Sequence, residues 1–212
     1  MNLLIDYGTG NLHSVKAAFQ RIGIPLTLSN NPDEIETADF VILPGVGAFG
    51  DAMDRLNQSG IASALKKRFE YSKPLLGICL GMQLLFESSD EAPGISGLGL
   101  IKGHFKKLSP RPDAPKIPHM GWNTLDQAND NVLNYSGNWA YFVHSYALTY
   151  TEPGVVLFTT HYGEAIPAVV RKDSAAGFQF HPEKSGQSGE TMLKTMITHL
   201  FEGGLNGIIS SD

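Results

Sequence analysis

The sequence predicts an α/β fold of the doubly wound class, in which a mostly parallel central sheet carries an antiparallel or mixed extension. In the first half of the 212-residue chain, short apolar runs alternate with stretches of helical periodicity. Strands that are apolar throughout are typical of a parallel sheet covered by helices on both faces. In the second half, apolar runs follow one another closely, which favours antiparallel pairing. Because crossovers between parallel strands are right-handed, the alternation predicts a doubly wound arrangement.

The first half contains four predicted strands and two predicted helical stretches. The strands are short apolar runs at residues 3–5, 26–28, 40–43 and 75–78. A first helix is predicted from apolar residues at helical spacing, which are Leu12, Val15, Phe19 and Ile22. Gly23 ends that helix. A longer helical stretch covers residues 51–69, with a break near Gly60.

The second half begins with a predicted helix at residues 81–88 and a polar stretch at 89–97. Residues 110–118 hold four prolines and are predicted to form a loop. Further strands are expected at residues 141–143, 155–158, 168–170 and 177–180. A closing helix has one apolar face, formed by Met192, Leu193, Met196, Ile197 and Leu200. Because the chain shows neither repeats nor a linker, we expect residues 1–212 to form a single domain.

Composition and charge argue against several classes of function. Hydrophobic residues make up 42% of the chain and charged residues 17%, which is typical of a globular protein. The net charge is −5 without a basic run, so we expect no nucleic-acid partner. The longest mostly apolar stretch, residues 74–86, is too short to span a bilayer. The N-terminus lacks the positive region of a signal peptide, and we therefore expect a cytoplasmic protein.

The sharpest local motif is Gly77-Ile78-Cys79-Leu80-Gly81, where a buried strand runs into a helix. This is the pattern of a nucleophile elbow, with sulfur in place of the serine oxygen. The turn is tight, so residues two before and two after the nucleophile must be small. A thiol at a helix N-terminus is favoured as the thiolate, and the N–H of Leu80 would point toward a developing oxyanion. The alternative is a buried cysteine that only fills a glycine-rich packing site. As the single cysteine, it excludes an internal disulfide and a cysteine zinc cluster.

A thiolate nucleophile needs a base, and the base needs an acceptor that orients it. His181 follows the strand expected at 177–180, and Pro182 stops that strand. Glu183 could then turn back toward the imidazole at the strand end, where sites form in open α/β sheets. Taken alone, the tripeptide is better explained as a turn histidine beside an unrelated glutamate.

The glycine-rich segment 44–50 follows the third strand, and three interpretations of it stay open. Glycines at 45 and 47 allow close backbone approach, so the loop could cradle a phosphate or donate N–H groups to an oxyanion. A plain tight turn is the third. The spacing matches neither the Walker nor the dinucleotide pattern.

Three motifs in this order resemble the landmarks of the class I (triad) glutamine amidotransferases. They are Pro44-Gly45-Val46-Gly47, residues 77–83 around Cys79, and Phe180-His181-Pro182-Glu183. The resemblance covers the whole chain and implies a flavodoxin-like amidotransferase domain. Within this family the chain resembles most the glutaminase subunits that serve a histidine-biosynthesis synthase. The segments that carry this closer resemblance are residues 6–11, 118–123, 141–146 and 181–185.

The resemblance implies a role for each site residue. Cys79 would take the γ-glutamyl group of glutamine as a thioester, His181 would move the protons, and Glu183 would orient His181. The N–H groups of Leu80 and of the Gly45–Val46 region would form the oxyanion hole. The positions implied to bind glutamine are Gly47, Gln83, Ser145 and Tyr146.

The implied partner is a (β/α)₈-barrel cyclase subunit that receives the ammonia through an internal passage. The positions that match its docking face are Asn11, Trp122, Tyr141 and Lys184. No cofactor and no metal are implied. Three alternatives remain: an amidotransferase that feeds a different synthase, a stand-alone hydrolase of γ-glutamyl compounds on the same fold, and a binding protein whose elbow cysteine is unused.

Overall fold

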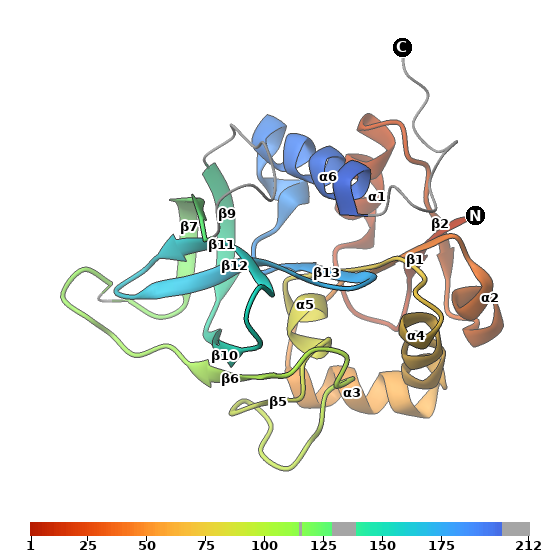
Figure 1. Cartoon of the computed structure of the whole chain (residues 1–212), viewed down its shortest axis with the longest axis horizontal. Helices are drawn as coiled ribbons and strands as arrows, with labels where there is room; N and C mark the ends of the chain where they lie inside the picture. Colours follow the sequence, from red (N-terminus) through yellow and green to blue (C-terminus); the bar gives the residue numbers. More distant parts are fainter. Residues whose placement is uncertain (115, 129–138, 201–212) are drawn as a thin grey trace.

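The computed structural model describes residues 1–114, 116–128 and 139–200; Pro115, within the loop expected at 110–118, lies outside them. Within these ranges the central element is an eight-stranded sheet (Figure 1). Its strands, in order across the sheet, are β2 (Thr27–Ser29), β1 (Asn2–Ile5), β3 (Phe40–Leu43), β4 (Leu75–Ile78), β13 (Ala175–Phe178), β12 (Ala165–Lys172), β11 (Val156–His161) and β8 (Asp126–Gln127). From β2 to β13 neighbouring strands are parallel, and from β13 to β8 they are antiparallel. The predicted parallel sheet with an antiparallel extension is confirmed.

Helices cover both faces of the parallel half. α1 (Leu12–Arg21) and α6 (Gly186–Leu200) lie on one face, and α2 (Pro32–Thr37), α3 (Phe49–Gln58), α4 (Ile61–Glu70) and α5 (Leu80–Leu84) lie on the other (Figure 1). Successive residues of β1 therefore enter different cores: Leu4 packs with Phe19 of α1, whereas Leu3 and Ile5 pack with Leu65 of α4. A strand buried on both faces has no polar side, which explains its continuous apolar sequence.

Two small sheets complete the second half of the described chain. One joins β10 (Tyr146–Thr151), β6 (Gly103–Lys107) and β5 (Ser88–Ser89), and the other pairs β7 (His119–Thr124) with β9 (Trp139–His144). A short 3₁₀ helix, η1 (Pro182–Lys184), precedes α6. The end of β9 and the start of β10 lie over the C-terminal end of β4, where the site described below is built.

Two local predictions differ from the structure, and the α-helices and strands that the sequence did not predict are α2, β5, β6, β7, β8 and β10. The helix expected at 81–88 ends at Leu84, because the carbonyls of Leu84, Leu85 and Phe86 accept bonds from the segment 98–101 instead of continuing the helix. The strand expected at 177–180 ends at Phe178, after which the N–H of His181 donates to Tyr141 O of β9. The helix α2 was not predicted, because only Ile35 among its six residues is buried and no apolar period marks it.

A buried arginine ties α2, β3 and β4 together. The Arg68 guanidinium is fully buried, and Nη1 donates to Ile35 O and Ala38 O at 2.7 Å each, while Nη2 donates to Pro74 O at 2.8 Å. Burial lowers the pKa of Arg68 to about 10, so the group stays charged at neutral pH. Two of its acceptors, Ile35 O and Ala38 O, are buried backbone carbonyls that need a partner, whereas Pro74 O also accepts from Val41 N at 3.2 Å.

We expect Arg68→Ala to lower the free energy of unfolding by roughly 3 kcal/mol, since it removes the guanidinium donor from the buried carbonyls of Ile35 and Ala38. The measurement is urea denaturation followed by circular dichroism. Arg21→Ala is the matched control, because Arg21 forms an exposed ion pair with Glu190 and such pairs contribute about 1 kcal/mol or less. Equal midpoints for the two variants would contradict a structural role for Arg68.

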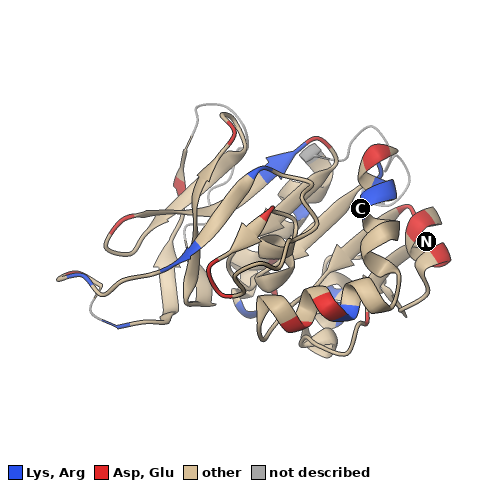
Figure 2. Cartoon of the chain, turned by 90° about the horizontal axis from the view of Figure 1, so that it is seen from below, with Lys and Arg blue, Asp and Glu red and all other residues tan. Residues whose placement is uncertain are grey.

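Charged residues of both signs are interspersed over the described surface. Figure 2 shows Lys and Arg on strands, loops and helices, with Asp and Glu among them. Such mixing gives no extended field of one sign that would steer a polyanion. Of the helices in the described ranges, none has the length and apolar character needed to cross a bilayer.

Candidate active site

The turn from β4 into α5 holds Cys79 in a strained backbone conformation. Its φ is 54° and its ψ is −111°, a region that residues other than glycine rarely occupy. A Cβ added to Gly77 would lie 2.6 Å from Gly81 O, and one added to Gly81 would lie 1.9 Å from Leu43 O. Both positions therefore require glycine, and the prediction of small residues on either side of the nucleophile is confirmed.

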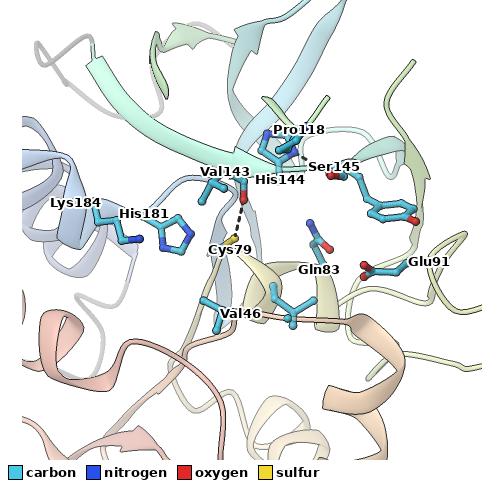
Figure 3. A pocket seen from close by; sticks show the side chains of 13 residues that line it. Val46, Cys79, Gln83, Glu91, Pro118, Val143, His144, Ser145, His181 and Lys184 are labelled. Atoms are coloured by element: carbon cyan, nitrogen blue, oxygen red, sulfur yellow. Dashed lines mark hydrogen bonds between the residues drawn. The ribbon is translucent and has the colours of Figure 1, made fainter. Parts of the chain in front are cut away.

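The thiol lies at the floor of a cavity of about 340 Å³ (Figure 3). Cys79 is 6% exposed, and its Sγ–H donates to Val143 O at 3.8 Å. The backbone N–H of Cys79 donates to Phe178 O at 2.7 Å, which ties the elbow to β13. A buried thiol that still faces a cavity is accessible to a small substrate.

His181 and Glu183 form a buried pair beside the thiol. His181 Nδ1 lies 2.7 Å from Glu183 Oε1, and the two side chains are 3% and 2% exposed. Pro182 begins η1, which turns the chain so that Glu183 reaches back to the imidazole. Because Nδ1–H donates to the carboxylate, Nε2 is left to face Cys79 (Figure 3), and within the described ranges Nε2 has no hydrogen-bond partner.

The surroundings of His181 favour its charged form. Burial on its own would lower the pKa of His181, but the Cys79 sulfur and the Glu183 carboxylate outweigh it and raise the pKa to about 10. At neutral pH the imidazole therefore carries a hydrogen on both nitrogens and is positively charged. A protonated imidazole beside the sulfur can act as a general acid toward a group bound at Cys79.

The glycine-rich loop after β3 packs directly on the elbow. A Cβ on Gly45 would lie 2.6 Å from Gly81 N and 2.8 Å from Leu80 Cβ, so only glycine permits this approach. Val46 and Gly47 line the cavity, and Gly47 has a φ of +98°. Of the three interpretations left open by the sequence, this position favours N–H donation to an oxyanion on a substrate at Cys79.

Comparison with known proteins agrees with this geometry. The family model described as glutamine amidotransferase class-I matches residues 3–200. This chain belongs to the class-I glutamine amidotransferases. The "Imidazole glycerol phosphate synthase subunit HisH" of Prochlorococcus marinus is 48% identical over 93% of each chain. The protein of the same name from Bacillus subtilis is 46% identical over 90% of this chain and 92% of its own.

Solved structures share the amidotransferase fold at low sequence identity. A "Crystal structure of glutamine amidotransferase" matches with a TM-score of 0.74 and 20% identity, covering 94% of this chain and 98% of that one. The "Structure of PurLQS from Thermotoga maritima" matches with a TM-score of 0.70 and 18% identity over the same shares. At this identity the likeness concerns the fold alone.

The remaining predicted glutamine-binding positions of the amidotransferase line the same cavity. Gln83 is 4% exposed, and its Nε2 donates to Gln179 Oε1 at 3.2 Å. Ser145 and Tyr146 form the opposite wall, between β9 and β10. The structure thus brings Gly47, Gln83, Ser145 and Tyr146 around Cys79, although they lie far apart in the sequence.

One cavity residue of the amidotransferase, Glu91, escaped the sequence analysis. It lies in the polar stretch 89–97, where no motif or periodicity singled it out. Its Oε2 accepts a bond from Phe49 N at 2.9 Å, which holds the carboxylate at the side of the cavity away from His181 (Figure 3). It supplies a negative charge to a cavity whose other end holds the His181 imidazolium. Among the residues that the structure describes, no group of three or more His, Cys, Asp or Glu is placed to hold a metal ion.

Three of the four predicted docking residues of the amidotransferase lie close together, and one of them, Lys184, lines the cavity. Trp122 of β7 and Tyr141 of β9 are cross-strand partners whose ring centroids lie 6.1 Å apart. Lys184 Nζ lies 5.8 Å from the centre of the Tyr141 ring, and Lys184 also lines the cavity. Asn11 instead caps α1, where its Oδ1 accepts from Ser14 N at 3.3 Å.

Proposed function

We propose that this amidotransferase is the glutaminase subunit of imidazole glycerol phosphate synthase. It hydrolyses glutamine to glutamate and ammonia and passes the ammonia to a second subunit. The observation that carries the proposal is the alignment of Cys79, His181 and Glu183 at one end of a cavity whose other end is acidic. The name shared by the relatives from Prochlorococcus marinus and Bacillus subtilis, a synthase subunit, supports the pathway and the presence of a partner subunit.

Cys79, His181 and Glu183 act as a triad in the proposed reaction. The Cys79 thiolate attacks the side-chain amide carbon of glutamine, and the N–H groups of Leu80 and of the Gly45–Val46 region stabilise the oxyanion. His181 gives its proton to the leaving nitrogen, so that ammonia departs and a thioester remains. His181 then takes a proton from water, whose oxygen attacks the thioester carbon. Glutamate leaves as the thiolate re-forms, and Glu183 holds His181 in orientation throughout.

Both ends of the substrate have a partner in the proposed complex. The Glu91 carboxylate binds the α-ammonium group, and the backbone at Gly47, Ser145 and Tyr146, with the Gln83 amide, binds the rest of the amino acid. The cavity extends from Glu91 to Cys79 and His181 (Figure 3). When the α-ammonium group of glutamine binds Glu91, the side-chain amide carbon therefore lies at the Cys79 thiol. Shorter or longer amides would leave one end unpaired.

The proposed partner is a (β/α)₈-barrel cyclase that adds the ammonia to a phosphorylated ribulosyl substrate and yields imidazole glycerol phosphate and AICAR for histidine biosynthesis. It docks on the face formed by Trp122, Tyr141 and Lys184, with Asn11 beside α1. Trp122 is 53% exposed, and large exposed aromatic residues are frequent anchors of interfaces. We further propose a single cytoplasmic domain, without a cofactor, that spans the whole chain.

The test is to measure glutamine hydrolysis by the chain alone and after addition of the barrel cyclase subunit of an imidazole glycerol phosphate synthase. We expect hydrolysis to rise when the cyclase is present. Stimulation by another synthase but not by the cyclase would assign the chain to a different pathway. High activity without any partner would favour a stand-alone γ-glutamyl hydrolase, and no labelling by a glutamine analogue would favour a binding protein.

His181→Ala is expected to reduce kcat by at least about 10³-fold in the complex, because it removes the group that moves both protons. Glu183→Gln should lose less, since the imidazole remains. The double variant should be little worse than His181→Ala, because residues that act as a unit are not additive. Losses that multiply in the double variant would show that His181 and Glu183 act independently.

Glu91→Gln is expected to raise KM for glutamine roughly tenfold or more with a small change in kcat, because it removes a charged partner of the substrate. Glu87→Gln is the matched control: its Oε2 also accepts a backbone N–H, from Gly103 at 3.0 Å, but it does not line the cavity. The measurement is KM and kcat for glutamine of both variants, from steady-state kinetics. A KM that rises equally in both would remove Glu91 from the substrate site.

A further inference from the structure

Two buried histidines outside the triad are joined by a hydrogen bond. His119 of β7 is 2% exposed and His144 at the end of β9 is 6% exposed. His119 Nδ1 lies 3.1 Å from His144 Nε2. His144 also lines the glutamine cavity, so this pair reaches the site without belonging to the proposed triad (Figure 3).

Asn123 sets the direction of hydrogen bonding at one end of this pair. Its Oδ1 accepts from Thr124 N at 2.8 Å, and its Nδ2 donates to His161 O at 2.8 Å, so the amide can take only one orientation. The same Nδ2 lies 3.2 Å from His119 Nε2 and has a second hydrogen to donate. His119 Nε2 is therefore an acceptor and carries no hydrogen.

The other end of the pair requires the same direction. His144 Nδ1 lies 2.9 Å from Tyr146 O, a backbone carbonyl that can only accept. His144 Nδ1 therefore carries the hydrogen, and a neutral His144 accepts at Nε2 from Nδ1–H of His119. The two ends agree, and donation runs from Asn123 through His119 and His144 to Tyr146 O.

This order requires both imidazoles to be neutral. A second proton on either ring would meet another N–H: Nε2–H of His119 would face the Asn123 amide, and Nε2–H of His144 would face His119. Burial also lowers the pKa of His119 to about 4 and, with the neighbouring His119, the pKa of His144 to about 3. The His119 ring is held between those of Phe142 and Tyr162, at centroid distances of 4.7 and 4.1 Å.

The chain of bonds ends on the backbone that surrounds the thiol. Val143 O accepts from Cys79 Sγ–H, and Ser145 and Tyr146 form a wall of the cavity. The bond from His144 to Tyr146 O closes the turn between β9 and β10, and Ser145 O is held by Leu108 N at 2.8 Å. At the opposite end, Asn123 directly follows Trp122 of the docking face.

We infer that His119 and His144 are positioning residues that hold the Val143–Tyr146 backbone in the geometry that binds glutamine. This inference rests on the proposed function, because the bound amino acid is the one assigned there. A displaced turn would weaken substrate binding more than the chemical step, since bonds outside the turn hold the Cys79 backbone to Phe178 O and His181 to Glu183.

The first test is nitrogen NMR of histidine side chains in the wild-type complex at pH 7. We expect both His119 and His144 to be neutral with the hydrogen on Nδ1, and each assignment is checked by the loss of its signal in a His→Gln variant. A charged ring, or a hydrogen on Nε2 of either residue, would overturn the hydrogen-bond order.

The second test is the kinetics of His119→Phe, which keeps a ring between Phe142 and Tyr162 but removes both hydrogen bonds. We expect KM for glutamine to rise roughly tenfold, as for the loss of a buried hydrogen bond, with kcat changed less than about threefold. Tyr162→Phe is the control, because it loses a bond to Lys116 O in the same stack but outside the chain of bonds, and its KM should stay unchanged.

The outcomes separate the two proposals. A wild-type KM in a folded His119→Phe complex would overturn the positioning role, as would an equal rise in Tyr162→Phe. If the wild-type complex did not hydrolyse glutamine, the proposed function would fail, and with it the role assigned to the turn. The NMR measurement would still decide the order of the hydrogens, because it does not depend on activity.

Discussion

Replacing Cys79 by alanine is expected to abolish glutamine hydrolysis, with a loss of roughly 10⁵-fold or more in kcat. Of the residues that the structure describes at the cavity, Cys79 supplies the thiol that His181 faces, and neither the oxyanion donors nor the imidazole can form the thioester in its place. The fold should survive, because alanine is smaller and meets the same φ of 54° that cysteine already adopts. The measurement is glutamate release by the complex, together with thermal unfolding of both proteins.

A glutamine analogue that alkylates thiols gives an independent measurement of the same assignment. The chain contains one cysteine, so a single label located by mass spectrometry must lie on Cys79. Labelling should be blocked by an excess of glutamine and absent from the alanine variant. Turnover by a folded Cys79→Ala protein above the level of a blank would remove Cys79 from the mechanism.

The free chain is expected to hydrolyse glutamine about 10²–10³-fold more slowly than the complex with the barrel cyclase and its ligand. A loss of this size is typical when one N–H donor to the oxyanion is missing. The proposed gate is the peptide between Gly45 and Val46. Upstream the loop is held, because Tyr7 Oη donates to Pro44 O at 2.9 Å and Gly45 packs on the elbow. Downstream it is open: Val46 is 41% exposed, and a Cβ on Gly47 would meet nothing within 4 Å.

A partner need only favour the orientation of this peptide that donates its N–H, which is a population shift of a few kcal/mol. The test compares steady-state hydrolysis by the free chain, the complex, and the complex with the cyclase ligand bound. Gly47→Ala is informative because its φ of +98° disfavours alanine, so it should alter stimulation by the partner. Full activity in the free chain would eliminate the gate.

Much of the fold and of the catalytic turn could be predicted because the signals are local. Alternating apolar runs and helical periods located β1, β3, β4, α1, α3 and α4, since burial on two faces dictates residue type along a short segment. The elbow was visible because a tight turn admits only glycine at positions 77 and 81. His181 and Glu183 were identifiable only through the resemblance of residues 180–183 to an amidotransferase landmark, because the tripeptide by itself favours an unrelated turn.

Tertiary structure decided what depends on contacts between distant segments. Glu91 enters the cavity from a polar loop, Arg68 finds its three carbonyls on other elements, and neither position bears a periodic signal. The order of hydrogens in His119 and His144 follows from Asn123 at one end and Tyr146 O at the other, and the two histidines meet only when β7 pairs with β9. The sequence alone determined which residue types a buried strand or a tight turn can hold. A hydrogen bond between two loops depends on the direction in which each loop leaves its strand. The packing of the whole molecule sets that direction.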